Sequence, residues 1–155
     1  NDRIVTGSME MGHYIKYLSQ KPFLPPKMKL KEVFDFFEAD FDAFIRDFPQ
    51  FGQYRETRIN ELSGGEVRIA EIWLCLCSKS HFCILDEPFS YLAPVAIEVV
   101  QRLIQREKSN KGIIISDHNY EPLLEIADEV LLLSDGYMHI AKERSDLVRY
   151  GYCRG

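Results

Sequence analysis

Two adjacent acidic residues are the side chains of this sequence best suited to chemistry. Asp86 and Glu87 follow an apolar run, Phe82 to Leu85, and a proline comes directly after them. A buried strand that ends in acids presents them at its C-terminal edge, where ligands bind in open α/β sheets. There one carboxylate can hold Mg²⁺ and the other can act as a base toward water. The simpler alternative is a solvated pair of acids at the end of a strand.

A serine and two glycines offer a second kind of chemistry. Ser63, Gly64 and Gly65 stand ahead of an apolar-periodic segment, which is the composition of a helix N-terminus. Ser63, or Asn60 before it, can cap that helix, and the glycines leave backbone N–H groups open to an anion such as a phosphate. The alternative is a plain turn at the start of a helix, which these residues do not exclude by themselves.

A third group of polar residues follows the apolar run Ile113 to Ile115. This short continuous run predicts a strand that is buried on both faces. The strand would bring Ser116, Asp117 and His118 to the same sheet edge as the two acids. Isolated histidines usually have structural roles, but this one would lie beside a pair of acids.

The N-terminal half contains the elements that must position these residues. A strand rich in aromatic and β-branched residues is predicted from His13 to Ser19, and it ends at Gln20 before a proline-rich loop, residues 22–26. Residues 28–60 are predicted to be helical, with phenylalanines at a spacing that favours a core. These core residues are Phe34, Phe37, Phe41, Phe44 and Phe48. Four apolar residues outside that spacing are expected to form an exposed socket for a partner helix: Phe23, Leu24, Phe36 and Phe51.

The C-terminal half is predicted to alternate helices and strands. The helix after Gly65 is expected to bury Ile69, Ile72, Trp73 and Leu76. The further elements are a helix from Pro94 to Asn110, a short helix after Pro122, a hairpin around the turn 134–136, and a terminal helix with a frayed end in 142–155.

Length, composition and charge exclude several classes of protein. The chain has 155 residues, of which 46% are hydrophobic and 28% charged, so one globular domain is expected. A net charge of -5 gives no general affinity for nucleic acid, and no nucleic-acid partner is expected. No apolar run approaches the roughly 20 residues needed to span a bilayer. Any contact with a membrane is therefore expected to go through another subunit.

The four cysteines favour a reducing compartment. Three of them, Cys75, Cys77 and Cys83, lie in apolar surroundings, and the fourth is Cys153. This pattern favours packed, reduced thiols in the cytoplasm over a disulfide framework. A metal site built from the first three and His81 is disfavoured, because residues two apart on a helix point to different sides.

The motif LSGGE, residues 62–66, followed by an apolar strand and the pair Asp86-Glu87, resembles the nucleotide-binding domain of ABC (ATP-binding cassette) ATPases. The resemblance implies an α/β fold: a P-loop NTPase-like sheet with helices on both faces and a small helical subdomain. Residues 1–21 and 80–155 would form the core, and residues 22–79, including the LSGGE helix, the helical subdomain. The implied ligands are ATP and Mg²⁺.

The same resemblance assigns roles to individual residues. Asp86 would hold Mg²⁺, Glu87 would be the general base, and His118 would contact the γ-phosphate. Gln20 would reach the metal or the attacking water. In the family, two domains close head to tail, so the LSGG loop would cover ATP held by a second ABC ATPase domain. The implied nucleotide-binding residues are Gln20, Ser63, Gly64, Gly65, Glu66 and Asp86, and the implied metal ligands are Asp86 and Gln20.

Three departures from the family pattern stand out. No GxxxxGK[ST] phosphate-binding loop occurs in the sequence, so the chain is interpreted as the C-terminal two-thirds of an ABC domain. This polypeptide alone is expected to hydrolyse ATP very slowly or not at all. Ala93 stands where an aspartate usually precedes the proline, and Leu74 where an arginine is usual. The combination DEPFS and SDHN is similar to ATPases of lipopolysaccharide export and branched-chain amino acid uptake.

Three functions remain open from the sequence. The leading hypothesis is the ATP-hydrolysing subunit of an ABC transporter, working as a homodimer or heterodimer with a transmembrane permease subunit. It would be cytoplasmic and peripheral on the inner face of the cell membrane. The second hypothesis is a soluble ABC protein acting in translation, repair or cofactor assembly. The third is a non-hydrolysing domain that only binds and regulates a partner.

Overall fold

The computed structural model describes residues 14–134, 136–141 and 144–149. It divides into two compact units, one up to His118 and the other from Asn119 onward, and each is described by itself. His13, the predicted start of the first strand, and Cys153 lie outside the described residues.

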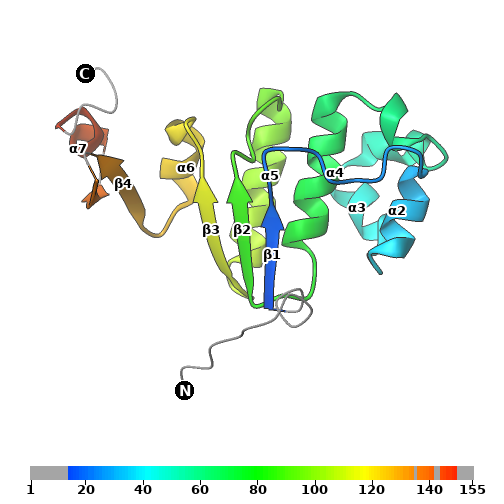
Figure 1. Cartoon of the computed structure of the whole chain (residues 1–155), viewed down its shortest axis with the longest axis horizontal. Coiled ribbons are helices and arrows are strands. Elements are labelled where there is room, and N and C mark those ends of the chain that lie inside the picture. Colours follow the sequence, from blue (N-terminus) through cyan, green and yellow to red (C-terminus); the bar gives the residue numbers. More distant parts are fainter. Residues whose placement is uncertain (1–13, 135, 142–143, 150–155) are drawn as a thin grey trace. The chain divides into compact units, whose positions relative to one another are not determined.

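The first unit is built on a three-stranded parallel sheet (Figure 1). Its strands are β1 (Ile15–Leu18), β2 (Phe82–Asp86) and β3 (Gly112–Ser116), in the order β1-β2-β3. Leu18 pairs with Leu85, and Asp86 pairs with Ser116. Because all three strands run the same way, their carboxyl ends lie at one edge of the sheet, as the sequence predicted.

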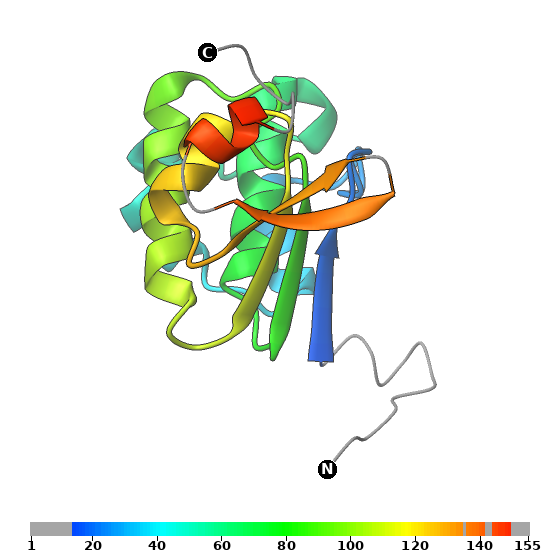
Figure 2. The same cartoon turned by 90° about the vertical axis from the view of Figure 1, so that its left-hand side faces the viewer.

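Two helices cover one face of this sheet, α4 (Gly64–Leu76) and α5 (Pro94–Glu107) (Figure 2). On that face Leu18, Cys83 and Leu85 are buried. On the opposite face Tyr17, Phe82 and Ile114 are 50–60% exposed. The prediction that the Ile113–Ile115 strand is buried on both faces is therefore wrong for the described residues, since no described element of this unit covers the second face.

Helix α4 starts at a reciprocal cap formed by its own sequence. The Ser63 backbone N–H donates to Glu66 Oε2 at 2.7 Å, and the Glu66 backbone N–H donates to Ser63 Oγ at 3.3 Å. This capping box satisfies two of the backbone donors left open at a helix start. The helix then runs through the interior, and the residues predicted to be buried are so: Ile69, Ile72, Trp73 and Leu76.

A small helical region precedes α4. It contains α2 (Leu30–Phe36), α3 (Phe41–Asp47), and the 3₁₀ segments η1 (Pro49–Tyr54) and η2 (Ile59–Glu61). The prediction of helix across 28–60 is correct in type, but the segment is divided into short pieces. Glu38 has φ 53°, outside the right-handed helical region, and Asp40 accepts from the Asp42 and Ala43 backbone N–H groups to start α3 anew.

An aromatic core holds this region together. The ring centroids of Phe34 and Phe44 are 4.7 Å apart, those of Phe44 and Phe51 4.8 Å apart, and those of Phe34 and Trp73 5.6 Å apart. Four of the five predicted core phenylalanines are buried, but Phe37 is 38% exposed because it follows the last residue of α2.

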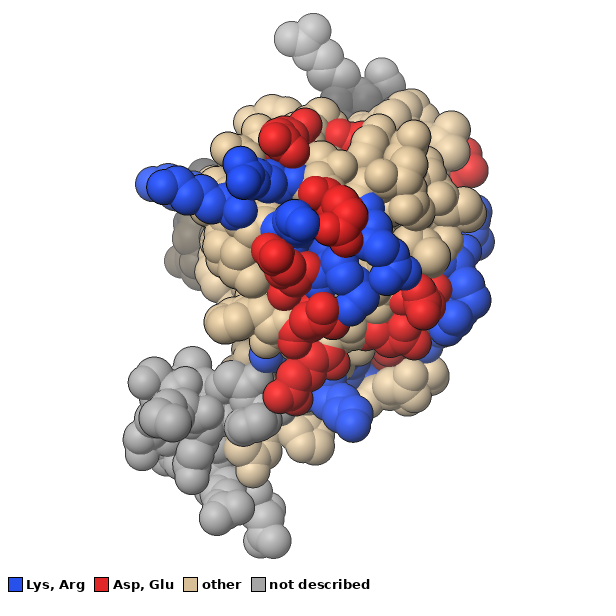
Figure 3. All heavy atoms as spheres, turned by 90° about the vertical axis from the view of Figure 1, so that its right-hand side faces the viewer, with Lys and Arg blue, Asp and Glu red and all other residues tan. Residues whose placement is uncertain are grey.

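Of the four residues of the predicted socket, two are exposed and two are buried. Phe51 is fully buried, since it belongs to a 3₁₀ segment and not to the helix whose periodicity placed it outside, and Leu24 is buried as well. Phe23 and Phe36 are exposed, and both rings contact the ring of Phe37 edge-on. The surface of this helical region carries both positive and negative side chains, as Figure 3 shows. Some of them form ion pairs between different segments of the region, such as Lys29 with Glu56 and Arg55 with Asp42.

The second unit contains α6 (Tyr120–Ile126), the antiparallel strands β4 (Val130–Ser134) and β5 (Tyr137–Ala141), and α7 (Arg144–Arg149). The predicted hairpin is confirmed, and Gly136 at its turn has φ 81°, which favours glycine. Leu132, Ala141 and Leu147 form the core of the unit. A helix in the predicted tail is confirmed as α7, and residues 150–155 lie outside the described residues. In the parts of the chain that the structure describes, no helix is long and apolar enough to cross a membrane.

Candidate active site

The carboxylate of Asp86 lies at the end of β2 on the open face of the sheet. Ser116 Oγ donates to Asp86 Oδ1 at 2.7 Å, and the Tyr17 hydroxyl donates to Asp86 Oδ2 at 3.2 Å. The hydrogen bond to Asp86 raises the pKa of Tyr17. Two neighbouring strands thus orient one carboxylate, and each oxygen keeps lone pairs that a cation can use.

Glu87 leaves the strand in an unusual backbone conformation. Its φ is 48°, and its backbone N–H donates to Ser116 O at 2.7 Å. A non-glycine residue in this left-handed region costs free energy, and such residues concentrate at functional sites. The two carboxylates have separate partners, Ser90 for Glu87 and Ser116 with Tyr17 for Asp86, so the two acids do not form one solvated pair.

His118 is brought to the acids by β3. Its Nδ1 lies 3.8 Å from Glu87 Oε1 and 3.7 Å from Asp117 Oδ1, and its side chain is 72% exposed. Ser90 Oγ donates to Glu87 Oε2 at 3.3 Å. The predicted meeting of these side chains at one sheet edge is therefore present, although the roles assigned to them stay predictions.

The sequence did not single out the support given by Asp117. Its side chain is fully buried, and Oδ2 accepts from the Phe89 backbone N–H at 3.0 Å. Asp117 therefore ties the loop after Glu87 to the end of β3. Tyr17 was also missed, and strand alternation, which puts it on the face of Asp86, could have indicated it.

Gln20 lies just beyond β1 at this edge and is exposed. Within the described part of the chain its side chain makes no hydrogen bond to Asp86. Gln20 thus follows the strand next to the one that ends in Asp86. Its predicted contact with a metal or water stays a prediction.

The turn at Ser63 faces solvent. Ser63 and Gly64 are exposed, and a Cβ on Gly64 would meet nothing within 4 Å. A Cβ on Gly65 would instead lie 2.9 Å from the carbonyl oxygen of Tyr91, so the loop after Ser90 packs directly on this turn. Burial alone would raise the pKa of Glu66, but hydrogen bonds from Ser63 and Tyr54 lower it. The structure thus uses the Glu66 carboxylate to cap its own helix.

Arg68 and Glu71 are two buried charges of α4 that the sequence did not single out. Arg68 donates to the backbone carbonyls of Asp86 and Glu87, directly behind the two acids. The available signal was that Arg68 and Glu71 stand among the apolar residues that follow Glu66 in this helix. They would have been read as surface residues on the polar side of an amphipathic helix.

Comparison with known proteins agrees with this arrangement. In open parallel α/β sheets, ligands bind at the carboxyl ends of the strands, where Asp86, Glu87 and His118 lie. The sequence profile of the family described as ABC transporter matches residues 3–90. The chain belongs to this family, which confirms the resemblance carried by LSGGE and the two acids.

Curated relatives match over part of their length. The lipopolysaccharide export system ATP-binding protein LptB of Acidithiobacillus ferridurans is 36% identical over 95 residues, which is 61% of this chain and 39% of that protein. The energy-coupling factor transporter ATP-binding protein EcfA2 of Mycoplasmoides gallisepticum is 43% identical over 77 residues, 49% of this chain and 24% of that protein. The matched part of this chain thus spans well under half the length of these relatives.

Solved structures support the fold. A chain described as the ATP binding subunit of an ABC transporter superposes with a TM-score of 0.75 at 18% identity, covering 92% of this chain and 65% of that one. An RNase-L inhibitor superposes with a TM-score of 0.67 at 21% identity, covering 81% and 27%. At these identities the likeness concerns the fold alone.

Proposed function

We propose that this chain supplies the metal-binding and water-activating part of an ATPase site that powers an ABC transporter. The observation that carries the proposal is the meeting of Asp86, Glu87 and His118 at one sheet edge. Asp86 is oriented by two hydroxyl groups, and His118 lies 3.8 Å from Glu87. The names of the curated relatives, ATP-binding proteins of lipopolysaccharide export and energy-coupling factor transporters, support the same function.

Asp86 fits a magnesium ion by its chemistry. Mg²⁺ prefers oxygen ligands and is usually held by one or two carboxylates together with nucleotide phosphates and water. The Asp86 carboxylate is fixed by its hydrogen bonds and faces the open side of the sheet. Gln20, at the same edge, is the second proposed ligand. Bound Mg²⁺ would neutralise charge on the phosphate oxygens of ATP.

Glu87 and His118 divide the remaining work. Ser90 holds one carboxylate oxygen of Glu87, which leaves Oε1 to take a proton from an attacking water. His118 is exposed beside it and can donate a hydrogen bond to the γ-phosphate. Neither residue binds the β- and γ-phosphates from the side of the phosphate-binding loop. The sequence contains no GxxxxGK[ST] motif that could form that loop. The 155-residue polypeptide alone is therefore expected to hydrolyse ATP very slowly or not at all.

Two partner proteins follow from this function. The exposed turn of Ser63, Gly64 and Gly65, with Glu66, would cover ATP held by a second ABC ATPase domain, identical or not. Phe23, Phe36 and Phe37 form an exposed aromatic group on the helical region, residues 22–79, where a permease segment could dock. The complete protein would then lie on the cytoplasmic face of the membrane.

The test is ATP hydrolysis by the full-length protein that contains this chain. We expect Mg²⁺-dependent phosphate release and co-purification with a multi-span membrane protein from detergent extracts. The variant Glu98→Gln, which changes an exposed glutamate of α5 that has no assigned role at the site, serves as a control and is expected to hydrolyse ATP normally. Absence of hydrolysis would contradict the enzymatic part and favour a regulatory domain. Hydrolysis with ribosome or DNA binding at physiological salt, and no membrane partner, would favour a soluble ABC protein.

A further inference from the structure

Helix α4 carries two charges in the interior of the protein. Arg68 is 5% exposed and Glu71 is 1% exposed. Burying an ion costs several kcal/mol of solvation unless partners compensate for it. The partners of these two side chains therefore indicate what the pair is for.

Arg68 joins the ends of two strands. Its Nη1 donates to Ser19 O at 2.6 Å, directly after β1. Its Nη2 donates to Asp86 O at 2.5 Å and to Glu87 O at 3.0 Å, at the end of β2. A planar guanidinium with several fixed donors can span two backbone segments in this way, whereas a lysine ammonium is a single point charge.

Glu71, one helical turn further on, holds the other side of the same loop. Its Oε1 accepts from the Phe23 backbone N–H at 2.6 Å and from the Leu24 backbone N–H at 3.3 Å. Burial raises the pKa of Glu71, and the two N–H groups and Arg68 oppose that rise. The segment that contains Gln20 is thus bound by α4 on both sides, through Ser19 and through Phe23 and Leu24.

The two side chains bind the backbone in preference to each other. Arg68 Nη1 and Glu71 Oε2 are 3.7 Å apart, too far for a good hydrogen bond. Arg68 Nε and Glu71 Oε2 have no hydrogen-bond partner among the described residues. If the two side chains served only to attract each other, Arg68 Nη1 and Glu71 Oε2 would be expected within hydrogen-bond distance. The hydrogen bonds to the backbone therefore explain the positions of the two side chains better than their mutual attraction does.

We propose that Arg68 and Glu71 are positioning residues that fix the Gln20 loop and the backbone of Asp86 and Glu87 against α4. The inference rests on the proposed ATPase function. Because Ser63 caps the start of α4, one helix then links the turn proposed to face a second domain to the proposed water-activating acid. Neither side chain reaches the reacting atoms, because their hydrogen bonds go to the backbone.

The test must separate positioning from mere stabilisation. The double variant Arg68→Met with Glu71→Leu in the full-length protein leaves no unpaired buried charge. It also removes the hydrogen bonds to five backbone groups, so its melting temperature is expected to fall, and activity is compared at a temperature at which the variant is folded. Its kcat is expected to fall about 10- to 100-fold with unchanged affinity for ATP, since small displacements of catalytic groups cost this much.

Single variants keep the proposal testable if the double variant does not fold. Arg68→Lys keeps the charge but cannot span both strands, and we expect it to lower kcat while the melting temperature holds. Glu71→Gln keeps a carbonyl oxygen for Phe23 and should lose less activity than Glu71→Leu. A folded double variant, or Arg68→Lys, with wild-type kcat would overturn the proposal. So would a loss of ATP affinity without a loss of kcat.

A second readout does not depend on activity. Hydrogen exchange at the Phe23 and Leu24 amides should speed up in Glu71→Leu relative to Glu71→Gln, and unchanged exchange would count against the proposed contact. The control Glu98→Gln should match wild type in both measurements. If wild type itself hydrolyses no ATP, the proposed function fails. If wild type hydrolyses ATP and the positioning variants do so equally well, only this inference fails.

Discussion

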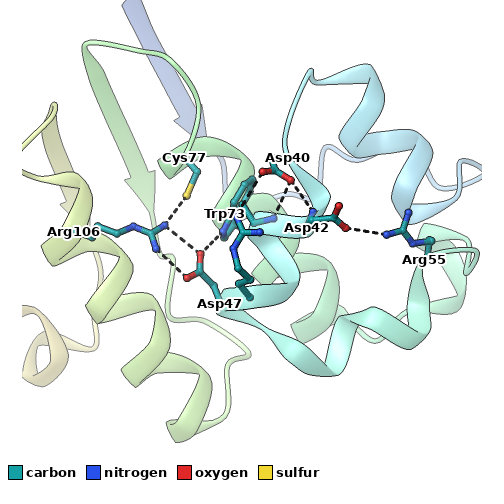
Figure 4. A network of polar contacts seen from close by, with 9 residues as sticks. Asp40, Asp42, Asp47, Arg55, Trp73, Cys77 and Arg106 are labelled. Carbon is teal, nitrogen blue, oxygen red and sulfur yellow. Dashed lines mark hydrogen bonds and ion pairs between the residues drawn. The ribbon is translucent and has the colours of Figure 1, made fainter.

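The contact between α3 and α5 gives a sharp prediction about stability. Asp47 accepts two hydrogen bonds from Arg106, at 3.0 and 3.2 Å, and one from Trp73 Nε1 at 2.8 Å (Figure 4). Arg106 also lies 3.5 Å from Cys77 Sγ. One carboxylate therefore joins the helical region, through α3, to both long helices of the first unit.

The substitution Asp47→Ala removes all three hydrogen bonds. Trp73 is 4% exposed, so its indole N–H would lose its acceptor inside the protein, at a cost of about 1–3 kcal/mol. The Arg106 side chain is 49% exposed, so solvent screens the ion pair, which adds at most about 1 kcal/mol. We expect Asp47→Ala to lower the free energy of unfolding by about 1–4 kcal/mol. Asp47→Asn keeps an acceptor for the indole and should cost about 1 kcal/mol or less.

Urea denaturation of the full-length protein, followed by Trp73 fluorescence, measures both variants. A double-mutant cycle with Arg106→Ala isolates the ion pair and should give a coupling energy below about 1 kcal/mol. If Asp47→Ala cost no more than Asp47→Asn, the buried indole would not depend on this carboxylate, and the reasoning would be refuted.

The pKa of Asp47 adds a pH dependence to the same contact. Burial alone would raise this pKa, but the hydrogen bonds from Arg106 and Trp73 lower it below its ordinary value of 3.8. A lowered pKa means that the stabilisation is present above the unfolded-state pKa and is lost as the pH falls through the folded-state value. The difference in stability between wild type and Asp47→Asn should therefore shrink in acid below about pH 4. A difference that is constant down to pH 2 would contradict the shift.

Three further predictions concern packing. Phe44→Ala should lower the free energy of unfolding by about 3–5 kcal/mol, because Phe44 is fully buried, whereas the exposed Phe36→Ala should cost under about 0.5 kcal/mol; equal effects in denaturation would be a contradiction. Burial raises the pKa of the Cys75 thiol to about 12, so iodoacetamide at pH 8 should label it, by mass spectrometry, only as fast as the protein opens. Gly65→Ala should lower the free energy of unfolding, measured by calorimetry, by about 1–3 kcal/mol, because the new Cβ would lie 2.9 Å from Tyr91 O. A variant more stable than wild type would show that the loop at Tyr91 can move aside at little cost.

The gathering of Asp86, Glu87 and His118 was predictable because it follows from topology alone. Two apolar runs that each end in polar residues, in parallel strands of one sheet, must present those residues at one edge. The cap at Ser63 was predictable as well, because serine with glutamate three residues later is a local signal. Neither prediction required knowledge of distant contacts.

Other features depended on contacts between distant segments. Phe51 was misplaced because helical periodicity was extended across Pro49, where the chain turns into a 3₁₀ segment with another repeat. The burial of Arg68 could not be predicted from the sequence, because only its bonds to the ends of two separate strands explain it. The exposed Ile114 shows that an apolar run indicates a strand without showing which of its faces is covered.

The most direct test of the central claim is the kinetics of Glu87→Gln in the full-length protein. Glutamine keeps the size of the side chain but cannot accept a proton from water. We expect kcat for ATP hydrolysis to fall about 10²- to 10⁴-fold while the dissociation constant for ATP with Mg²⁺ stays at the wild-type value. A variant that hydrolyses ATP as fast as wild type would contradict the assignment of Glu87, and with it the interpretation of this sheet edge as the catalytic site.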